Sequence, residues 1–212
     1  MMTNDPHVEQ LEARRLLAAT LVNGVLTVVG TAGDDNITVS YRADTKWFNV
    51  GVNGQGTSFG HAHVDRIIIF GLAGNDMISA SHVAGFKPGV IIKGGDGNDL
   101  IHGESGNDTI LGGLGDDFLS GEAGNDLIKG GWGDDQIDGG AGNDLLLGGE
   151  GDDDIHGDGG LDTILGNRGN DTLFGGAGDD SLLGGFGSDS LLGGSGHDHL
   201  FDHIGSNTFH QD

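Results

Sequence analysis

The chain contains no cysteine and only two prolines among its 212 residues. The absence of cysteine excludes disulfides and thiolate metal sites, so stabilisation beyond the core must have another source. Two prolines beside 45 glycines also exclude collagen, which needs many prolines and a glycine at every third position. No apolar run of about 18 residues is present, so no membrane-spanning helix is expected.

Basic residues are scarce as well. Nine lysines and arginines accompany 33 aspartates and glutamates, which gives a formal charge of −24. This balance argues against nucleic acid as a partner, because binding to phosphates needs a basic surface. The acidic residues either coat a solvated or disordered surface or serve as ligands for a hard cation. Their placement along the chain decides between these two interpretations.

Residues 94–201 consist of twelve consecutive nonapeptides without insertion, beginning GGDGNDLIH, GESGNDTIL, GGLGDDFLS. Positions 1 and 4 are always glycine, position 6 is always aspartate, and position 8 is always Ile or Leu. Position 5 is Asn or Asp in nine repeats, and the exceptions are Leu161, Ser188 and His197. A disordered acidic segment would not keep four positions constant through twelve cycles, so the placement favours the cation-ligand interpretation.

The repeat also predicts a fold. Glycines at positions 1 and 4 indicate a tight turn, since glycine permits positive φ and close backbone approach. Positions 7 to 9 alternate about one aliphatic residue and predict a three-residue strand. We therefore expect an all-β, right-handed parallel β-roll in which two nonapeptides form one coil and repeats n and n+2 stack. One inward aliphatic per nonapeptide is a thin core, so bound ions are expected to hold the roll together.

Stacking would place the position-6 aspartates in two columns, where their like charges repel. Carboxylates together with backbone carbonyls would form an all-oxygen cage, which suits Ca²⁺ better than Mg²⁺, zinc or copper. Ten n/n+2 pairs predict about ten Ca²⁺ ions, which would neutralise about 20 of the 24 excess negative charges. The predicted ligands are Asp99, Asp108, Asp117, Asp126, Asp135, Asp144, Asp153, Asp162, Asp171, Asp180, Asp189 and Asp198, with Asp76 stacked beneath Asp99.

The pattern GGxGxDxUx of residues 94–201 resembles the RTX, or haemolysin-type, calcium-binding nonapeptide repeat. The resemblance implies a parallel β-roll that is disordered without calcium and folds when calcium is present. It implies no toxin, protease or lipase activity, because in such proteins those activities reside in other domains.

The remaining residues divide into three segments. Residues 19–93 are expected to form a β-cap with a hairpin about Asn23-Gly24 and two outlying repeats, at 30–38 and 71–79. A partner for Asp35 in the first of these is less evident than one for Asp76. Residues 202–212 resemble a degenerate capping repeat with Asn207 in place of aspartate.

Residues 1–18 form the third segment. Their stretch VEQLEARRLLA, at 8–18, resembles the LEPR-XLL segment of planctomycete-type surface and exported proteins, with Ala13 in place of the usual proline. The resemblance implies export or surface sorting, so we expect an extracellular or cell-surface location. An incidental short amphipathic helix is the alternative.

The two outer faces of the roll are expected to differ. Position 9 of the even-numbered repeats forms a nearly continuous apolar stripe, and the odd-numbered repeats carry more polar residues there. We expect the stripe to pack against another copy of the chain or a surface partner, although outward aliphatics can also simply favour strand formation. The stripe consists of Leu111, Lys129, Leu147, Leu165, Leu183 and Phe201.

No catalytic motif accompanies the repeats: neither GxSxG nor HExxH occurs. His61, His63, His197, His199 and His203 have no fixed place in the repeat and are expected to be polar surface or cap residues. We predict a non-enzymatic, secreted or surface calcium-binding roll with a structural, adhesive or self-associating role. The alternative is a folding and secretion module of a larger secreted hydrolase or toxin.

Overall fold

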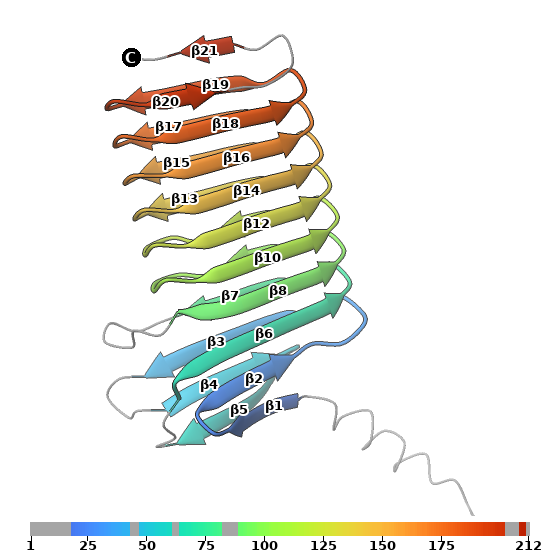
Figure 1. Cartoon of the computed structure of the whole chain (residues 1–212). Helices are drawn as coiled ribbons and strands as arrows, with labels where there is room; N and C mark the ends of the chain where they lie inside the picture. The colour runs from blue at the N-terminus through green and yellow to red at the C-terminus, as the bar shows by residue number, and fades with distance from the viewer. Residues whose placement is uncertain (1–17, 43–46, 61–63, 82–88, 202–207, 211–212) are drawn as a thin grey trace, which may run out of the picture.

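The computed structural model describes residues 18–42, 47–60, 64–81, 89–201 and 208–210. Every regular element within these ranges is a strand, and they contain no helix long and apolar enough to cross a membrane. The strands stack like rungs from the N-terminal to the C-terminal end (Figure 1). Their bounds are β1 (Ala18–Val22), β2 (Val25–Val29), β3 (Asn36–Arg42), β4 (Trp47–Val52), β5 (Gln55–Gly60), β6 (Arg66–Ala73), β7 (Met77–Ser81), β8 (Val90–Asp96), β9 (Leu100–His102), β10 (Thr109–Leu114), β11 (Phe118–Ser120), β12 (Leu127–Trp132), β13 (Gln136–Ala141), β14 (Leu145–Glu150), β15 (Asp154–Gly159), β16 (Thr163–Arg168), β17 (Thr172–Ala177), β18 (Ser181–Phe186), β19 (Ser190–Ser195), β20 (His199–Phe201) and β21 (Thr208–His210).

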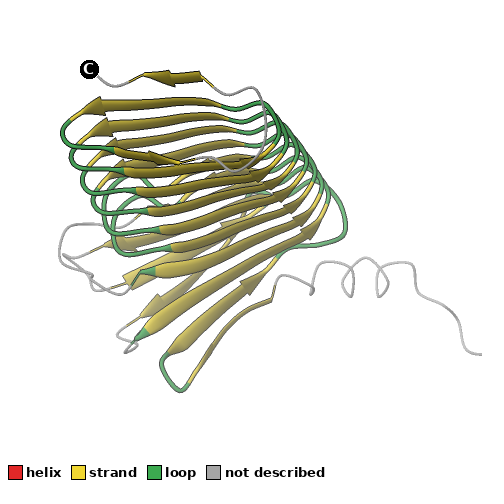
Figure 2. Cartoon of the chain, turned by 45° about the horizontal axis from the view of Figure 1, so that its top comes forward, coloured by secondary structure: helices red, strands yellow, loops and turns green. Residues whose placement is uncertain are grey.

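The strands form two sheets, and turns join the two sheets at both edges of the roll (Figure 2). One sheet has ten strands in the order β1-β2-β6-β8-β10-β12-β14-β16-β18-β20. We call it the even-repeat sheet, because β10 to β20 come from the even-numbered nonapeptides. The other, the odd-repeat sheet, has eleven strands in the order β21-β19-β17-β15-β13-β11-β9-β7-β3-β4-β5. The all-β parallel roll predicted from the nonapeptide period is confirmed.

The register of the strands follows the repeat. Ile110 pairs with Ile128, and Leu119 pairs with Ile137, both in parallel and both eighteen residues apart. Two nonapeptides therefore make one coil, and repeats n and n+2 stack as expected. The position-8 side chains from Ile101 to Leu191 are completely buried between the sheets. They form a single file of aliphatic residues in each sheet and no wider core.

Antiparallel strands close the N-terminal end of the roll. β1 and β2 form the expected hairpin about Asn23-Gly24, with φ values of 49° and 80°. A second hairpin, between β4 and β5, turns at Asn53-Gly54 with φ values of 50° and 74°. Sequence reasoning did not predict β5, although Asn-Gly is the same turn signal there. Parallel pairing begins as early as β2 with β6 and β3 with β7, so the roll continues into the predicted cap.

At the C-terminal end, β21 pairs in parallel with β19 and extends the odd-repeat sheet by one strand. Residues 202–207 of the predicted capping repeat lie outside the described residues. Residues 1–17 of the export-like segment at 1–18 also lie outside them, as do His61, His63 and His203, whereas Ala18 begins β1.

The left-handed backbone positions differ in part from expectation. Position 4 has positive φ throughout the repeats, as at Gly97 (129°) and Gly151 (132°). The second such position is 2 and not 1, and it has positive φ even where it is not glycine, as at Glu104 (78°) and Asn167 (79°). Position 1 is therefore glycine for a different reason, which concerns its contact with the position-6 aspartate.

Candidate metal centre

Fourteen aspartates form two buried columns, one along each edge of the roll. Each is at most 7% exposed although each carries an ionisable carboxyl group. The column of the odd-numbered repeats contains Asp35, Asp76, Asp99, Asp117, Asp135, Asp153, Asp171 and Asp189, and that of the even-numbered repeats contains Asp108, Asp126, Asp144, Asp162, Asp180 and Asp198. All thirteen aspartates predicted as ligands from the sequence lie in these columns.

One carboxyl oxygen of each aspartate connects successive coils. The backbone amide of Asp99 donates to Oδ1 of Asp117 at 2.8 Å, and that of Asp135 donates to Oδ1 of Asp153 at 2.9 Å. The same bond recurs along both columns at 2.7 to 3.0 Å. The side chain of each aspartate thus reaches back to the preceding coil, towards the N-terminal end of the roll, and this bond fixes the orientation of its carboxyl group.

The other oxygen, Oδ2, is buried without a hydrogen-bond partner in ten of these aspartates. A buried carboxylate oxygen without a donor is costly, because it has lost its water and gained no replacement. Repetition of the same deficit at regular intervals indicates a ligand position and not a local packing defect. The ten are Asp76, Asp99, Asp108, Asp117, Asp126, Asp135, Asp144, Asp153, Asp162 and Asp180.

The position-1 glycine leaves the space into which Oδ2 projects. A Cβ added to Gly148 would collide with Oδ2 of Asp153 and would lie 2.9 Å from the carbonyl oxygen of Gly166, in the next coil. The corresponding carboxylate and carbonyl oxygens meet beside Gly112, where the carbonyl is that of Gly130 at 2.8 Å. Glycine at position 1 therefore keeps open a cradle in which a carboxylate oxygen and a backbone carbonyl oxygen converge.

Burial makes the charged form of these carboxylates unfavourable. Desolvation raises the pKa of Asp153 to about 8, and repulsion from the neighbouring carboxylates of the column adds to the effect. Desolvation likewise raises the pKa values of Asp108 and Asp117 to about 7 and that of Asp126 to about 6. Near neutral pH, the columns therefore need either protons or cations to compensate their charge.

The lowest aspartate of the odd column differs from the others. Oδ2 of Asp35 accepts a hydrogen bond from the amide of Thr31, and Oδ1 accepts one from the Asn53 side-chain amide, both at 2.5 Å. The amide of Asp35 donates to Oδ1 of Asp76 at 2.8 Å, which supplies the partner that the sequence left unclear. Protein donors thus satisfy this carboxyl group, and the cap ends the column.

Position 5 forms a second ladder, which sequence reasoning missed. The amide of Asp116 donates to Oδ1 of Asn98 at 3.1 Å, and the amide of Asp134 donates to Oδ1 of Asp116 at 3.0 Å. These side chains are exposed and accept from the coil that follows them in the chain, whereas those at position 6 accept from the coil that precedes them. The recurrence of Asn and Asp at position 5 was the available signal, since both can accept from a backbone amide.

The donor set fits a hard divalent cation. Within the described ranges, no three His, Cys, Asp or Glu side chains converge on one point, so a bound metal would need backbone carbonyls as well as carboxylates. An all-oxygen set of carboxylates and carbonyls is what Ca²⁺ prefers. His197 and His199 are exposed, although both are chain neighbours of the buried Asp198.

Comparison with known families gives an independent result. Six overlapping segments between residues 91 and 210 match the RTX calcium-binding nonapeptide repeat (4 copies), and together they span more than half of the chain. No curated protein matches the chain. The match includes the repeats whose aspartates line both columns. The chain therefore belongs to the RTX calcium-binding nonapeptide repeat family.

Proposed function

We propose that calcium binding in the two aspartate columns drives the folding of this β-roll. The observation that carries the proposal is the set of ten buried Oδ2 atoms without a partner, which recur beside the carbonyl oxygens of the next coil. Calcium bound there would replace the missing donors and neutralise the repulsion between stacked carboxylates. The proposed ligands are the position-6 aspartates from Asp99 to Asp198 together with Asp76.

The number of ions follows from the stacked pairs. The hydrogen-bonded aspartate pairs number seven in the odd column and five in the even column. The lowest odd pair includes Asp35, which protein donors already satisfy. The remaining pairs agree with about ten Ca²⁺ ions, enough to compensate about 20 of the 24 excess negative charges.

We place the chain outside the cell, as a structural, adhesive or self-associating module without catalytic function. Repeated weak calcium sites suit extracellular calcium, which is millimolar, and would stay empty at cytosolic concentrations. The LEPR-XLL-like residues 8–18 support export or sorting to the surface.

Far-UV circular dichroism of the full chain tests the proposal. In chelator we expect a largely disordered spectrum, and calcium should convert it cooperatively to a β-rich spectrum. Magnesium at the same concentrations is the matched control and should produce little β-structure, since it prefers strict octahedral coordination and retains its waters. A chain that is already β-rich in chelator at neutral pH and does not respond to calcium would refute the proposal.

A further inference from the structure

A shallow apolar groove follows the outer face of the even-repeat sheet, parallel to the axis of the roll. It has a volume of about 510 Å³ and crosses β12, β14, β16 and β18. Its floor consists of the position-2 residues Gly131, Gly149, Asn167 and Gly185, and the three glycines have no side chain to fill it. Leu147, Leu165 and Leu183 form one wall, as the apolar stripe predicts.

The second wall consists of position-3 residues, which the sequence analysis did not consider. Trp132, Glu150, Arg168 and Phe186 lie side by side on adjacent strands, in that order. Trp132 is 63% exposed and Phe186 is 59% exposed. Two large aromatic side chains so open to solvent on a regular sheet indicate a surface that another molecule covers.

Positive charge is concentrated in the same groove. The twelve nonapeptides contain only two cationic residues, Lys129 and Arg168, and both line it. Arg168 Nε lies 3.5 Å from Glu150 Oε1, and its guanidinium lies 5.9 Å from the centre of the Phe186 ring. Glu150 is the groove's sole acidic residue among those described, so this part of a strongly acidic chain carries no excess of negative charge.

The order of residues along the position-3 wall is self-complementary. A line drawn between β14 and β16 has Glu150 on one side and Arg168 on the other, followed outward by Trp132 and Phe186. A two-fold axis along this line, parallel to the strands, brings Glu150 of one copy against Arg168 of the other, twice. The same operation brings Trp132 against Phe186 and Leu147 against Leu165.

We propose that the even-repeat face is the interface of a homodimer in which two rolls pack face to face with antiparallel axes. If the axes of the two rolls were parallel instead, the strands of the two copies would run in opposite directions. The position-3 wall of one copy would then lie on the leucine wall of the other. Glu150 and Arg168 would then lose water against leucines without gaining a charged partner, which disfavours that arrangement. The antiparallel dimer pairs Glu150 with Arg168 twice and covers Trp132 and Phe186. Lys129 then faces Leu183, and its flexible stem lets the ammonium group stay in water.

The size of the face suits a stable dimer. The six strands from β10 to β20 lie symmetrically about the line between β14 and β16. At about six residues each they cover about 20 Å by 29 Å, or about 600 Å² on each partner, which is at the lower end of the range for an interface of standard size. The interface would thus need the whole face and not the groove alone.

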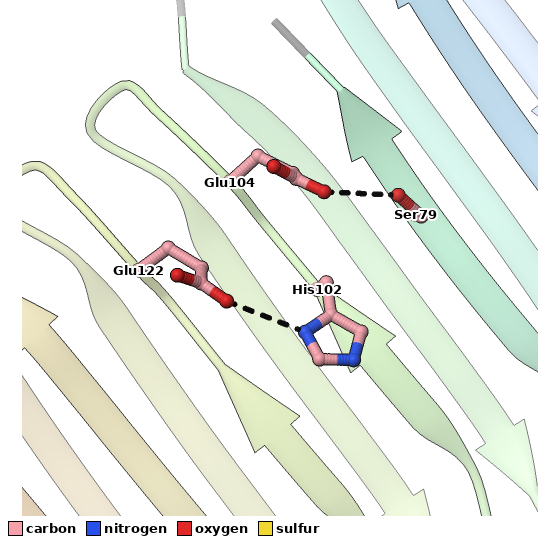
Figure 3. A network of polar contacts seen from close by, with 4 residues as sticks. All are labelled: Ser79, His102, Glu104 and Glu122. Atoms are coloured by element: carbon pink, nitrogen blue, oxygen red, sulfur yellow. Dashed lines mark hydrogen bonds and ion pairs between the residues drawn. The ribbon is translucent and has the colours of Figure 1, made fainter.

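The odd-repeat face is unsuited to the same contact. There the Ser79 hydroxyl donates to Glu104 at 3.3 Å, and His102 Nδ1 lies 3.6 Å from Glu122 Oε1 (Figure 3). Burying these carboxyl groups against a second copy would remove their water without supplying new donors. The odd-repeat face can therefore serve as the control surface for variants of the even-repeat face.

The dimer rests on the proposed function, because only the calcium-folded roll presents this face. The test uses the full chain in calcium, with sedimentation velocity to measure its oligomeric state and circular dichroism of the same samples to measure its folding. We expect the wild-type chain to dimerise. Arg168→Glu and Glu150→Arg should each weaken dimerisation at least tenfold, since each variant places like charges opposite one another.

Mixing the two charge variants restores the pairing. In the antiparallel dimer, position 150 of one chain faces position 168 of the other. The Arg168→Glu chain carries glutamate at both positions and the Glu150→Arg chain carries arginine at both, so the mixture should recover dimers that neither variant forms alone. Leu147→Asp should also give monomers, whereas Leu192→Asp, at the same repeat position on the odd-repeat face, should leave the dimer intact.

Cross-linking tests the direction of the two rolls. The natural chain has no cysteine, so the variants Glu150→Cys and Arg168→Cys each carry a single thiol. Under mild oxidation in calcium, the mixture of these two variants should form a disulfide-linked dimer far more readily than either variant alone. A dimer whose mixed variants cross-link no better than each variant by itself would overturn the antiparallel arrangement.

Two further results would overturn the proposal while leaving calcium-driven folding in place. One is a wild-type chain that is β-rich in calcium but monomeric, and the other is a pair of charge variants that do not recover dimers on mixing. A chain that remains disordered in calcium would instead refute the proposed function, and the dimer with it.

Discussion

The backbone amide of Asp135 donates a 2.9 Å hydrogen bond to Oδ1 of Asp153, one coil further along the roll. This bond uses one carboxyl oxygen to hold two coils together and turns the other towards Gly148. The same aspartate therefore has two tasks. Its Oδ1 fixes the spacing of the coils, and its Oδ2 is available to a cation.

Asp153→Asn separates these two tasks. The asparagine carbonyl can still accept from the Asp135 amide, but the variant lacks the negative charge. We expect the calcium concentration at half-maximal β-signal to rise on the order of tenfold, equivalent to about 1.4 kcal/mol. Asp152→Asn is the matched control, because this neighbour is exposed at position 5, where asparagine occurs in other repeats. Its calcium concentration at half-maximal β-signal should hardly change. Equal responses of the two variants would contradict the assignment of position 6.

Gly148→Ala tests the cradle without changing any charge. The added Cβ would collide with Oδ2 of Asp153 and lie 2.9 Å from the Gly166 carbonyl oxygen, so the carboxyl group must move out of the proposed site. We expect weaker calcium binding and lower thermal stability in calcium. Gly159→Ala serves as the control, because no atom lies within 4 Å of a Cβ added there. Calorimetric calcium titration of both variants measures the difference, and normal binding by Gly148→Ala would show that the cradle is not used.

The pKa values predict how the calcium-free chain responds to pH. Desolvation raises the pKa of Asp153 to about 8 and those of Asp108 and Asp117 to about 7, from an ordinary value of 3.8. Between about pH 4 and pH 8, the folded chain therefore binds more protons than the unfolded chain, and its stability falls as the pH rises. In chelator we expect more β-structure at pH 5 than at pH 8 by circular dichroism. Calcium should remove most of this dependence, because it compensates the same charges as the protons. A β-signal in chelator that increases from pH 5 to pH 8 would contradict the prediction.

The period of the sequence predicted the stacking, the inward position-8 residues and both aspartate columns. It did so because these features repeat, and a repeated residue type reports a repeated environment. The left-handed conformation at position 2 was missed because Glu104 and Asn167 occupy it as well as glycine. The register of the stacked coils, and not the preference of the residue, imposes that conformation.

Other features depend on distances that a sequence does not contain. The role of glycine at position 1 is visible only once Oδ2 of Asp153 is placed against Gly148. Likewise, the opposite directions of the position-5 and position-6 ladders emerge only from the donors and acceptors of Asp99 and Asn98. The repeat predicted which residues matter here, and geometry was needed to show how they act.

Leu161 offers a way to strengthen the roll, because it interrupts the position-5 ladder. Its amide donates to Oδ1 of Asn143 at 2.9 Å, but its own side chain has no oxygen to offer the Asp179 amide in the next coil. Leu161→Asn should supply that acceptor and raise the free energy of unfolding by about 1 kcal/mol. Guanidinium denaturation in excess calcium measures the change, with Leu161→Ala as the control that removes the exposed leucine without adding an oxygen. If alanine stabilises the roll as much as asparagine does, the gain comes from losing the leucine, and the ladder contributes nothing measurable at this coil.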